Sequence, residues 1–176
     1  NHKLSYSNYS ITNASGVIQS NSTPFSSAIH DWTDLVNANA LAEGNYTLIT
    51  YAKDSSNPYN DNSKTTWFYV KRTPPNITAG GWENPTPADD SYTKITSQTF
   101  NMTCGEQFID TVWIDMNGTI DSTPNDNNGL QFWWNFNLGE GTYTYTGYCN
   151  DSAGNLNYTE ERTLNVDLSD PTITLN

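Results

Sequence analysis

Apolar and polar residues alternate along several stretches of this chain, most clearly in its second half. Turn-forming segments separate these stretches, among them Asn117-Gly118, the run from Pro124 to Gly129, and Gly139-Glu140-Gly141. A period of two residues places successive side chains on opposite faces of a strand. The side chains that this parity predicts to face a core are Phe100, Met102 and Cys104; Val112, Ile114 and Met116; Phe132, Trp134, Phe136 and Leu138; Tyr143, Tyr145, Gly147 and Cys149; and Leu164, Val166 and Leu168. The pattern predicts an all-β chain.

The chain also contains an internal repeat. Three pairs of segments align at an offset of 97 or 96 residues: 41–55 with 138–152, 68–70 with 164–166, and 75–78 with 171–174. A weaker match joins residues 15–20 to residues 117–122. A period of about this length is the size of one immunoglobulin-like β-sandwich, so we expect tandem domains of that kind.

The register of the repeat divides the chain into three segments. Residues 1–72 are expected to form a domain that lacks its first strands, residues 73–168 a complete domain, and residues 169–176 the first strand of a following or neighbouring domain. Two explanations stay open. The sequence is a window on a longer repetitive chain, or its terminal strand completes the deficient domain of a neighbouring molecule. Both require a neighbour.

Composition narrows the class of partner. The chain has 7 Lys and Arg residues against 19 Asp and Glu residues, a net charge of −12. Nucleic acids and anionic membranes recruit clustered Lys and Arg, so neither is an expected partner. No apolar run has the length of a membrane span in this segment.

Two signals indicate an extracellular compartment. The first is a set of nine Asn-x-Ser/Thr sequons, at Asn8, Asn13, Asn21, Asn45, Asn76, Asn101, Asn117, Asn150 and Asn157. Covalent N-glycans are therefore expected, and strand parity predicts that Asn101 faces solvent. The second signal is the pair Cys104 and Cys149, the only two cysteines, which suits a disulfide in an oxidising space. The repeat puts Ala52 at the position of Cys149, which favours a bridge within residues 73–168.

One motif resembles a known family. The segment Gly139-Glu-Gly-Thr-Tyr143, five further residues, and Cys149-Asn-Asp-Ser-Ala-Gly-Asn155 looks like the tandem immunoglobulin-like repeats of large archaeal and bacterial surface glycoproteins, such as adhesins, sheaths and filaments. In such repeats a segment like Pro171-Thr-Ile-Thr174 opens the next domain. The resemblance implies an inter-sheet disulfide and a role in surface structure or adhesion, and it implies no chemistry.

The chain offers little for catalysis or for metal binding. Its two histidines lie in the weakly repeated first part, and Glu43 and Glu140 occupy the same turn in successive repeats, a domain length apart. We therefore predict that the chain is not an enzyme and has no cofactor. A calcium ion is the remaining option, with Asp167 and Asp170 as weak candidate ligands near a domain junction.

Outward-facing aromatic residues are the candidate contact surface. If the parity holds, seven large side chains point away from the two cores: Ile49, Tyr51, Trp67, Tyr69, Trp113, Trp133 and Tyr148. A contiguous apolar patch usually marks an interface. We therefore expect these residues to contact other copies of the chain or neighbouring repeats.

These expectations lead to a functional hypothesis. The chain is expected to be an extracellular structural glycoprotein, a repeat unit of a cell-surface fibre, sheath or stalk, assembled through sandwich contacts and strand addition. The alternative is an adhesin or carbohydrate-binding module that uses the exposed aromatic residues. A further alternative is an accessory domain of a secreted enzyme.

Overall fold

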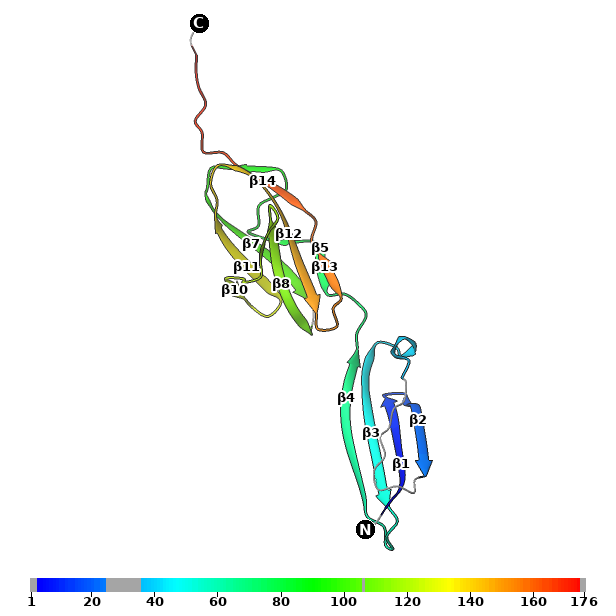
Figure 1. Cartoon of the computed structure of the whole chain (residues 1–176). Coiled ribbons are helices and arrows are strands. Elements are labelled where there is room, and N and C mark those ends of the chain that lie inside the picture. The colour runs from blue at the N-terminus through cyan, green and yellow to red at the C-terminus, as the bar shows by residue number, and fades with distance from the viewer. Residues whose placement is uncertain (1–2, 25–35, 106, 175–176) are drawn as a thin grey trace. The chain divides into compact units, whose positions relative to one another are not determined.

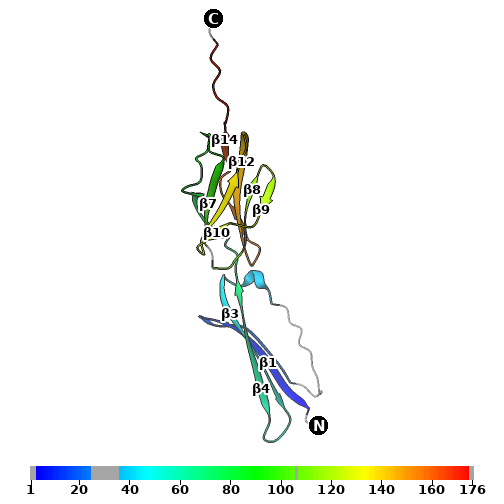
Figure 2. The same ribbon diagram turned by 90° about the vertical axis from the view of Figure 1, so that its left-hand side faces the viewer.

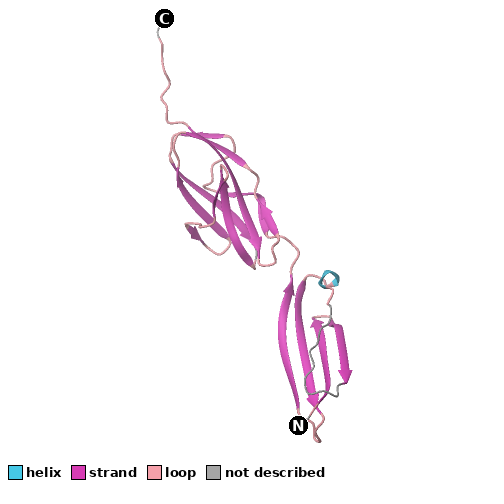
Figure 3. Ribbon diagram, in the orientation of Figure 1, coloured by secondary structure: helices cyan, strands magenta, loops and turns pink. Residues whose placement is uncertain are grey.

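The chain folds into two compact units, unit 1 (residues 1–72) and unit 2 (residues 73–176). The computed structural model describes residues 3–24, 36–105 and 107–174. Strands dominate both units, as Figure 3 shows, so the all-β prediction is confirmed.

Unit 2 is a sandwich of two sheets. Its strands are β5 (Asn76–Glu83), β6 (Ser91–Thr93), β7 (Ser97–Gly105), β8 (Ile109–Met116), β9 (Thr119–Asp121), β10 (Asp126–Asn127), β11 (Gln131–Asn137), β12 (Gly141–Asp151), β13 (Leu156–Tyr158) and β14 (Arg162–Val166). One sheet has the order β10-β11-β7-β5, and the other the order β6-β14-β12-β8-β9 with β13 also paired to β12. The two layers are visible in Figure 2, with β7 and β10 in one layer and β8, β9 and β12 in the other.

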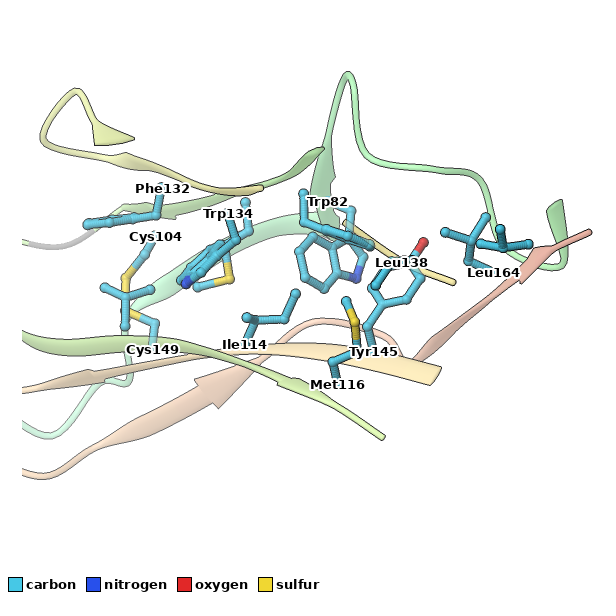
Figure 4. Packing of buried hydrophobic residues seen from close by; sticks show 14 residues of the cluster. Trp82, Cys104, Ile114, Met116, Phe132, Trp134, Leu138, Tyr145, Cys149 and Leu164 are labelled. Atoms are coloured by element: carbon cyan, nitrogen blue, oxygen red, sulfur yellow. A yellow bond between two sulfur atoms is a disulfide. The ribbon is translucent and has the colours of Figure 1, made fainter. Parts of the chain in front are cut away.

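The core of unit 2 lies between these sheets (Figure 4). Most residues that the alternation assigned to the inward faces are buried: Phe100, Met102, Cys104, Val112, Ile114, Met116, Phe132, Trp134, Leu138, Tyr145, Cys149, Leu164 and Val166. Leu168 is an exception, because β14 ends at Val166 and Leu168 is 46% exposed beyond it.

A disulfide joins the two layers. Cys104 on β7 is bonded to Cys149 on β12, and their Cα atoms lie 6.4 Å apart. The predicted pairing is confirmed. On the chain-entropy model, a cross-link that closes a loop of this length stabilises a fold by about 4 kcal/mol.

Unit 1 is a single antiparallel sheet in the part of the chain that the structure describes. Its elements are β1 (Leu4–Asn13), β2 (Gly16–Pro24), the short 3-10 helix η1 (Ala38–Ala40), β3 (Gly44–Asp54) and β4 (Asp61–Val70), and the sheet has the order β2-β1-β3-β4 (Figure 1). Its small core contains Tyr9, Ile11, Leu41 and Tyr46.

The repeat relates this sheet to one layer of unit 2. The aligned segments place β3 at the position of β12 and β4 at the position of β14, and the weaker match places β1 and β2 at the positions of β8 and β9. Under this alignment, the order β2-β1-β3-β4 in unit 1 is equivalent to the order β9-β8-β12-β14 in unit 2. Among the described residues of unit 1, no sheet corresponds to β10-β11-β7-β5.

Candidate interaction surfaces

Both units build the same corner before their longest aligned strand. In unit 1 the Oη of Tyr46 donates a hydrogen bond to the carbonyl of Ala42 at 2.9 Å, and in unit 2 the Oη of Tyr143 donates to the carbonyl of Gly139 at 3.2 Å. Immunoglobulin domains use a tyrosine in this way to fix the entry into a strand. The corner therefore sets where β3 and β12 begin.

An aspartate closes the turn after β3. The carboxylate of Asp54 accepts hydrogen bonds from the backbone N–H of Ser56 at 3.0 Å, from the N–H of Asn60 at 2.9 Å and from the Nδ2 of Asn60 at 2.8 Å, and also from the Ser56 hydroxyl. The bonds from Ser56 and Asn60 stabilise the ionised form, so the pKa of Asp54 lies well below its usual value.

The corresponding turn of unit 2 has the same arrangement. The carboxylate of Asp151 accepts from the backbone N–H of Ala153 at 3.0 Å, from the N–H of Asn155 at 2.9 Å and from the Nδ2 of Asn155 at 2.8 Å. An Asx side chain that bonds to the following backbone is a strong turn former. The turn after β12 is thus closed from within the turn itself.

A glutamate in each corner holds the segment that follows the last aligned strand. The carboxylate of Glu43 lies 3.2 Å from the Nζ of Lys71 and accepts a hydrogen bond from the backbone N–H of Arg72, also at 3.2 Å. The carboxylate oxygens of Glu140 lie 3.1 and 2.9 Å from the Oγ of Ser169, which donates to them. Arg72 and Ser169 are 97 residues apart, so the device repeats with the period of the sequence.

Unit 1 has a hollow on the inner side of its sheet, which we call the open face. Its volume is about 700 Å³. Apolar side chains form most of the lining, with polar groups toward one end: Leu4, Ser7, Asn8, Tyr9, Ile11, Val36, Leu41, Leu48, Thr50, Tyr51, Ala52, Asn62, Ser63, Lys64 and Phe68. Tyr51, which strand alternation predicted to point away from the core, is also among the lining residues.

Aromatic side chains cross three strands on the outer side of unit 2. Trp113 on β8 is directly opposite Tyr148 on β12, which is opposite Tyr158 on β13. The rings of Trp113 and Tyr148 are stacked with centroids 5.2 Å apart and an interplanar angle of 5°, and the Tyr148 and Tyr158 rings are tilted at 5.9 Å. The stacked rings of Trp113 and Tyr148 each cover one face of the other, and such cross-strand pairs stabilise a sheet.

The other predicted contact residues do not gather with these three. Trp133 lies on β11 and is half-buried, opposite Asn101. In unit 1, Trp67 on β4 is 73% exposed and Ile49 on β3 is 36% exposed, whereas Tyr51 and Tyr69 are half-buried. Trp67 is therefore the most accessible of the seven.

The sequons differ in how accessible their asparagines are. Four lie on exposed positions: Asn21, Asn45, Asn76 and Asn117. Four are half-buried: Asn8, Asn13, Asn150 and Asn157.

Asn101 differs from all the others, because it is only 3% exposed. The expectation that it faces solvent is wrong. The segment from Asn84 to Thr86 covers it: the Nδ2 of Asn101 donates to the carbonyl of Asn84 at 3.1 Å, and its backbone N–H donates to the Oγ1 of Thr86 at 2.7 Å. Strand parity found the correct face of the sheet, but this face is not open to solvent at Asn101.

The candidate calcium ligands lie after β14. Asp167 and Asp170 are exposed, and the carboxylate of Asp167 accepts a hydrogen bond from the N–H of Ser169 at 3.0 Å. Within the described ranges, no group of three His, Cys, Asp or Glu side chains could hold a metal ion. Calcium ligation by Asp167 and Asp170 stays a prediction.

Trp82 is a core residue that the sequence analysis missed. It is 8% exposed, packs edge-on against Phe100 and Tyr145, and donates from its Nε1 to the carbonyl of Glu160 at 3.1 Å. The register of β5 shifts between Ile77 and Trp82, so a simple alternation from Ile77 does not find it.

None of the helices among the described residues has the length and hydropathy of a membrane span.

No curated protein matches the chain. Solved structures give low-similarity matches. The fibronectin(III)-like modules of Clostridium thermocellum CbhA are 14% identical, with a TM-score of 0.42, over 99% of this chain and 86% of theirs. SGBP-B of the Bacteroides ovatus mixed-linkage glucan utilization locus, solved with a mixed-linkage heptasaccharide, is 17% identical, with a TM-score of 0.31, over 73% of this chain and 30% of its own.

A family model gives the assignment. The bacterial Ig-like domain matches residues 74–168, which is most of unit 2 and more than half of the chain. The matched segment contains the two-sheet core and the inter-sheet disulfide. The chain belongs to the bacterial Ig-like domain family.

Proposed function

We propose that this chain is a non-catalytic structural segment of an extracellular cell-surface glycoprotein, in which Ig-like units follow one another along a fibre, sheath or stalk. The observation that carries the proposal is the repetition of three devices in both units. Each unit has the tyrosine corner, the aspartate-closed turn and the glutamate that holds the departing segment.

The glutamate device suits a tandem array. In unit 1, Glu43 holds the backbone of Arg72, and three residues later Pro75 is buried and β5 of unit 2 begins at Asn76. In unit 2, Glu140 holds Ser169 just before the segment that the repeat aligns with Pro75 and its successors. Fixing the departure of the chain limits the conformations of the junction, which suits a structural array.

The compartment is inferred from the disulfide and the exposed sequons. A disulfide between two buried cysteines persists in oxidising surroundings, and glycans on an Asn-rich surface would shield the strands from proteases. Asn45 and Asn76 are expected to be modified, whereas Asn101 is expected to carry no glycan because its amide is buried and bonded.

Brief protease treatment of intact source cells tests the proposal. Peptides from both units should be released while the cells stay intact, and glycopeptide mass spectrometry should find sugar at Asn45 and none at Asn101. A cytoplasmic marker protein provides the control for lysis. Recovery of the protein only after lysis, with every sequon unmodified, would refute the proposal.

The carbohydrate-binding alternative rests on one observation, the 73% exposure of Trp67. A flat exposed indole can stack on a sugar ring, whereas Trp113 and Tyr148 are half-buried and each has one ring face covered by the other. Affinity electrophoresis in polysaccharide-containing gels distinguishes the alternatives. The structural proposal predicts no retardation of the chain, and retardation lost in Trp67→Ala would favour the binding module.

A further inference from the structure

Trp67 is exposed on the outer side of the unit 1 sheet, the side that faces away from the core of that unit. On the inner side, Tyr46 of β3 is 3% exposed, and its ring is stacked on Phe68, the residue directly opposite it in β4. Trp67 precedes Phe68 in β4, so strand alternation turns the indole to the outer side. The indole is 73% exposed there, and a neighbour that removes its apolar surface from water is therefore favoured.

A sequon lies on the same side of the sheet as this indole. Asn45 and Thr47 flank the inward-facing Tyr46 in β3, so both turn to the outer side. Thr47 is directly opposite Trp67, and the residue directly opposite Asn45 is Tyr69. Asn45 and Trp67 are thus diagonal neighbours, and such neighbours in an antiparallel pair lie about 7–8 Å apart. A sugar ring bonded to the Asn45 side chain can reach the indole.

The Asn45 side chain is accessible to modification. Asn45 is exposed, whereas Asn101 is buried and the Nδ2 of Asn157 donates a hydrogen bond to the carbonyl of Pro75 at 2.9 Å. The Nδ2 atom is the one that receives a glycan. Glycosylation joins it to C1 of the first sugar of an activated glycosyl phosphate donor; the bond from C1 to the phosphate oxygen breaks, and the nitrogen loses one proton.

Short side chains lie beside the indole on this side of the sheet. The row that contains Trp67 continues through Thr47 on β3 and Thr12 on β1 to Val17 on β2, because these residues are paired in register. A threonine side chain rises less far above a sheet than an indole does. The two threonines therefore leave space beside Trp67 for a sugar ring.

We propose that a glycan on Asn45 lies over the outer side of the unit 1 sheet, with its first sugar stacked on the indole of Trp67 beside Tyr69. The covalent attachment holds this sugar at a high effective concentration next to the indole, so it is favoured over free saccharides and over other copies of the chain. The inference rests on the proposed function, which supplies the glycan at Asn45. It assigns to Trp67 the role of holding a glycan of its own chain.

Hydroxyl-radical oxidation of the chain purified from source cells, measured for each residue by mass spectrometry, tests the proposal. Asn45→Gln removes the attachment site, and Asn21→Gln makes the same change on the inner side, where Asn21 is opposite the core residue Tyr9. Both asparagines are exposed, so neither substitution threatens the fold. Since a stacked sugar covers one face of the ring, we expect the oxidation rate of Trp67 to rise at least about twofold in Asn45→Gln and to stay unchanged in Asn21→Gln.

Glycopeptide analysis of the same samples separates the outcomes, and the buried Tyr46 should stay unreactive in every chain that remains folded. Sugar at Asn45 with equal oxidation of Trp67 in the unsubstituted chain and in Asn45→Gln would overturn this inference alone. An unmodified Asn45 would overturn it together with the predicted glycosylation. Protection of Trp67 that is independent of Asn45 and disappears on dilution would assign the indole to a contact with a second copy and would also overturn it. A glycan-protected Trp67 in a protein that only lysis releases would support the inference and overturn the proposed surface location.

Discussion

Units 1 and 2 have the same corner, the same closed turn and the same order of four aligned strands, yet among the residues that the structure describes only unit 2 has a second sheet over its core. The shared devices each lie within a short segment around β3 or β12, so a single stretch of sequence specifies them. The second sheet instead brings β5, β7 and β11 from distant parts of unit 2. Strand boundaries are therefore determined by short stretches of sequence, whereas closure of the core depends on segments that are far apart in the sequence.

The two units should differ most in the stability that each loses when a large aromatic side chain of its core is removed. Trp134 is fully buried between the sheets of unit 2, whereas Phe68 lines the open face and stacks on Tyr46 at 5.4 Å. We expect Trp134→Ala to destabilise unit 2 by about 3–5 kcal/mol, and Phe68→Ala to destabilise unit 1 by less than half as much. Denaturant unfolding of the full chain, assigned to each unit by hydrogen exchange, measures both. Equal losses would indicate that the core of unit 1 is closed.

The disulfide should stabilise one unit only. Cys104→Ala with Cys149→Ala removes the link between β7 and β12, and we expect unit 2 to lose about 2–4 kcal/mol because its unfolded chain gains freedom. The equivalent position in unit 1 is Ala52, so its unfolding transition should not change. A parallel loss in unit 1 would contradict the expectation that the disulfide stabilises unit 2 alone.

Alkaline pH should weaken unit 2 first. Burial raises the pKa of Tyr145 to about 12 from 10.0, and its hydroxyl donates to the carbonyl of Pro87 at 2.7 Å. Because the folded pKa is raised, the stabilisation is complete below pH 10 and is lost as the pH rises toward 12. Unfolding free energies of unit 2 across this range should fall, and Tyr145→Phe should flatten the fall. If the unfolding free energy of Tyr145→Phe falls with pH as steeply as before, another group causes the loss of stability at alkaline pH.

Acidic pH should lower the stability of unit 1 by weakening the turn after β3. The hydrogen bonds from Ser56 and Asn60 lower the pKa of Asp54 below its ordinary value of 3.8. Because the folded pKa is lowered, the stabilisation is present above pH 3.8 and is lost as the pH falls further. We expect a small loss in unit 1, since Asp54 is near solvent, and a smaller acid dependence in Asp54→Asn. A variant that keeps the full acid dependence would contradict this assignment.

Parity of the strands predicted much of the core correctly, because side chains of one strand alternate between two faces whatever lies above them. It located Phe100, Ile114 and Trp134, and it placed both cysteines on inward faces. Parity cannot tell which segment covers a face. Asn101 was assigned to solvent because the covering residues Asn84 to Thr86 are distant in sequence from it.

Other features need more than alternation to be found. Trp82 follows a register shift in β5, and Leu168 follows the end of β14, so each breaks the parity of its neighbours. The bonds from Glu43 to Arg72 and from Glu140 to Ser169 depend on the folded proximity of a corner and a departing segment. The repeat did contain a signal for them, since both glutamates occupy the same position in the period.

The central claim is that two sheets close the core of unit 2, whereas the described strands of unit 1 form one sheet over a smaller core. Peptide-resolved hydrogen exchange of β3 and β12, measured on the dilute chain, tests it most directly. We predict that amides of β3 exchange at least about tenfold faster than those of β12. Equal protection of β3 and β12 in the dilute chain would contradict the claim.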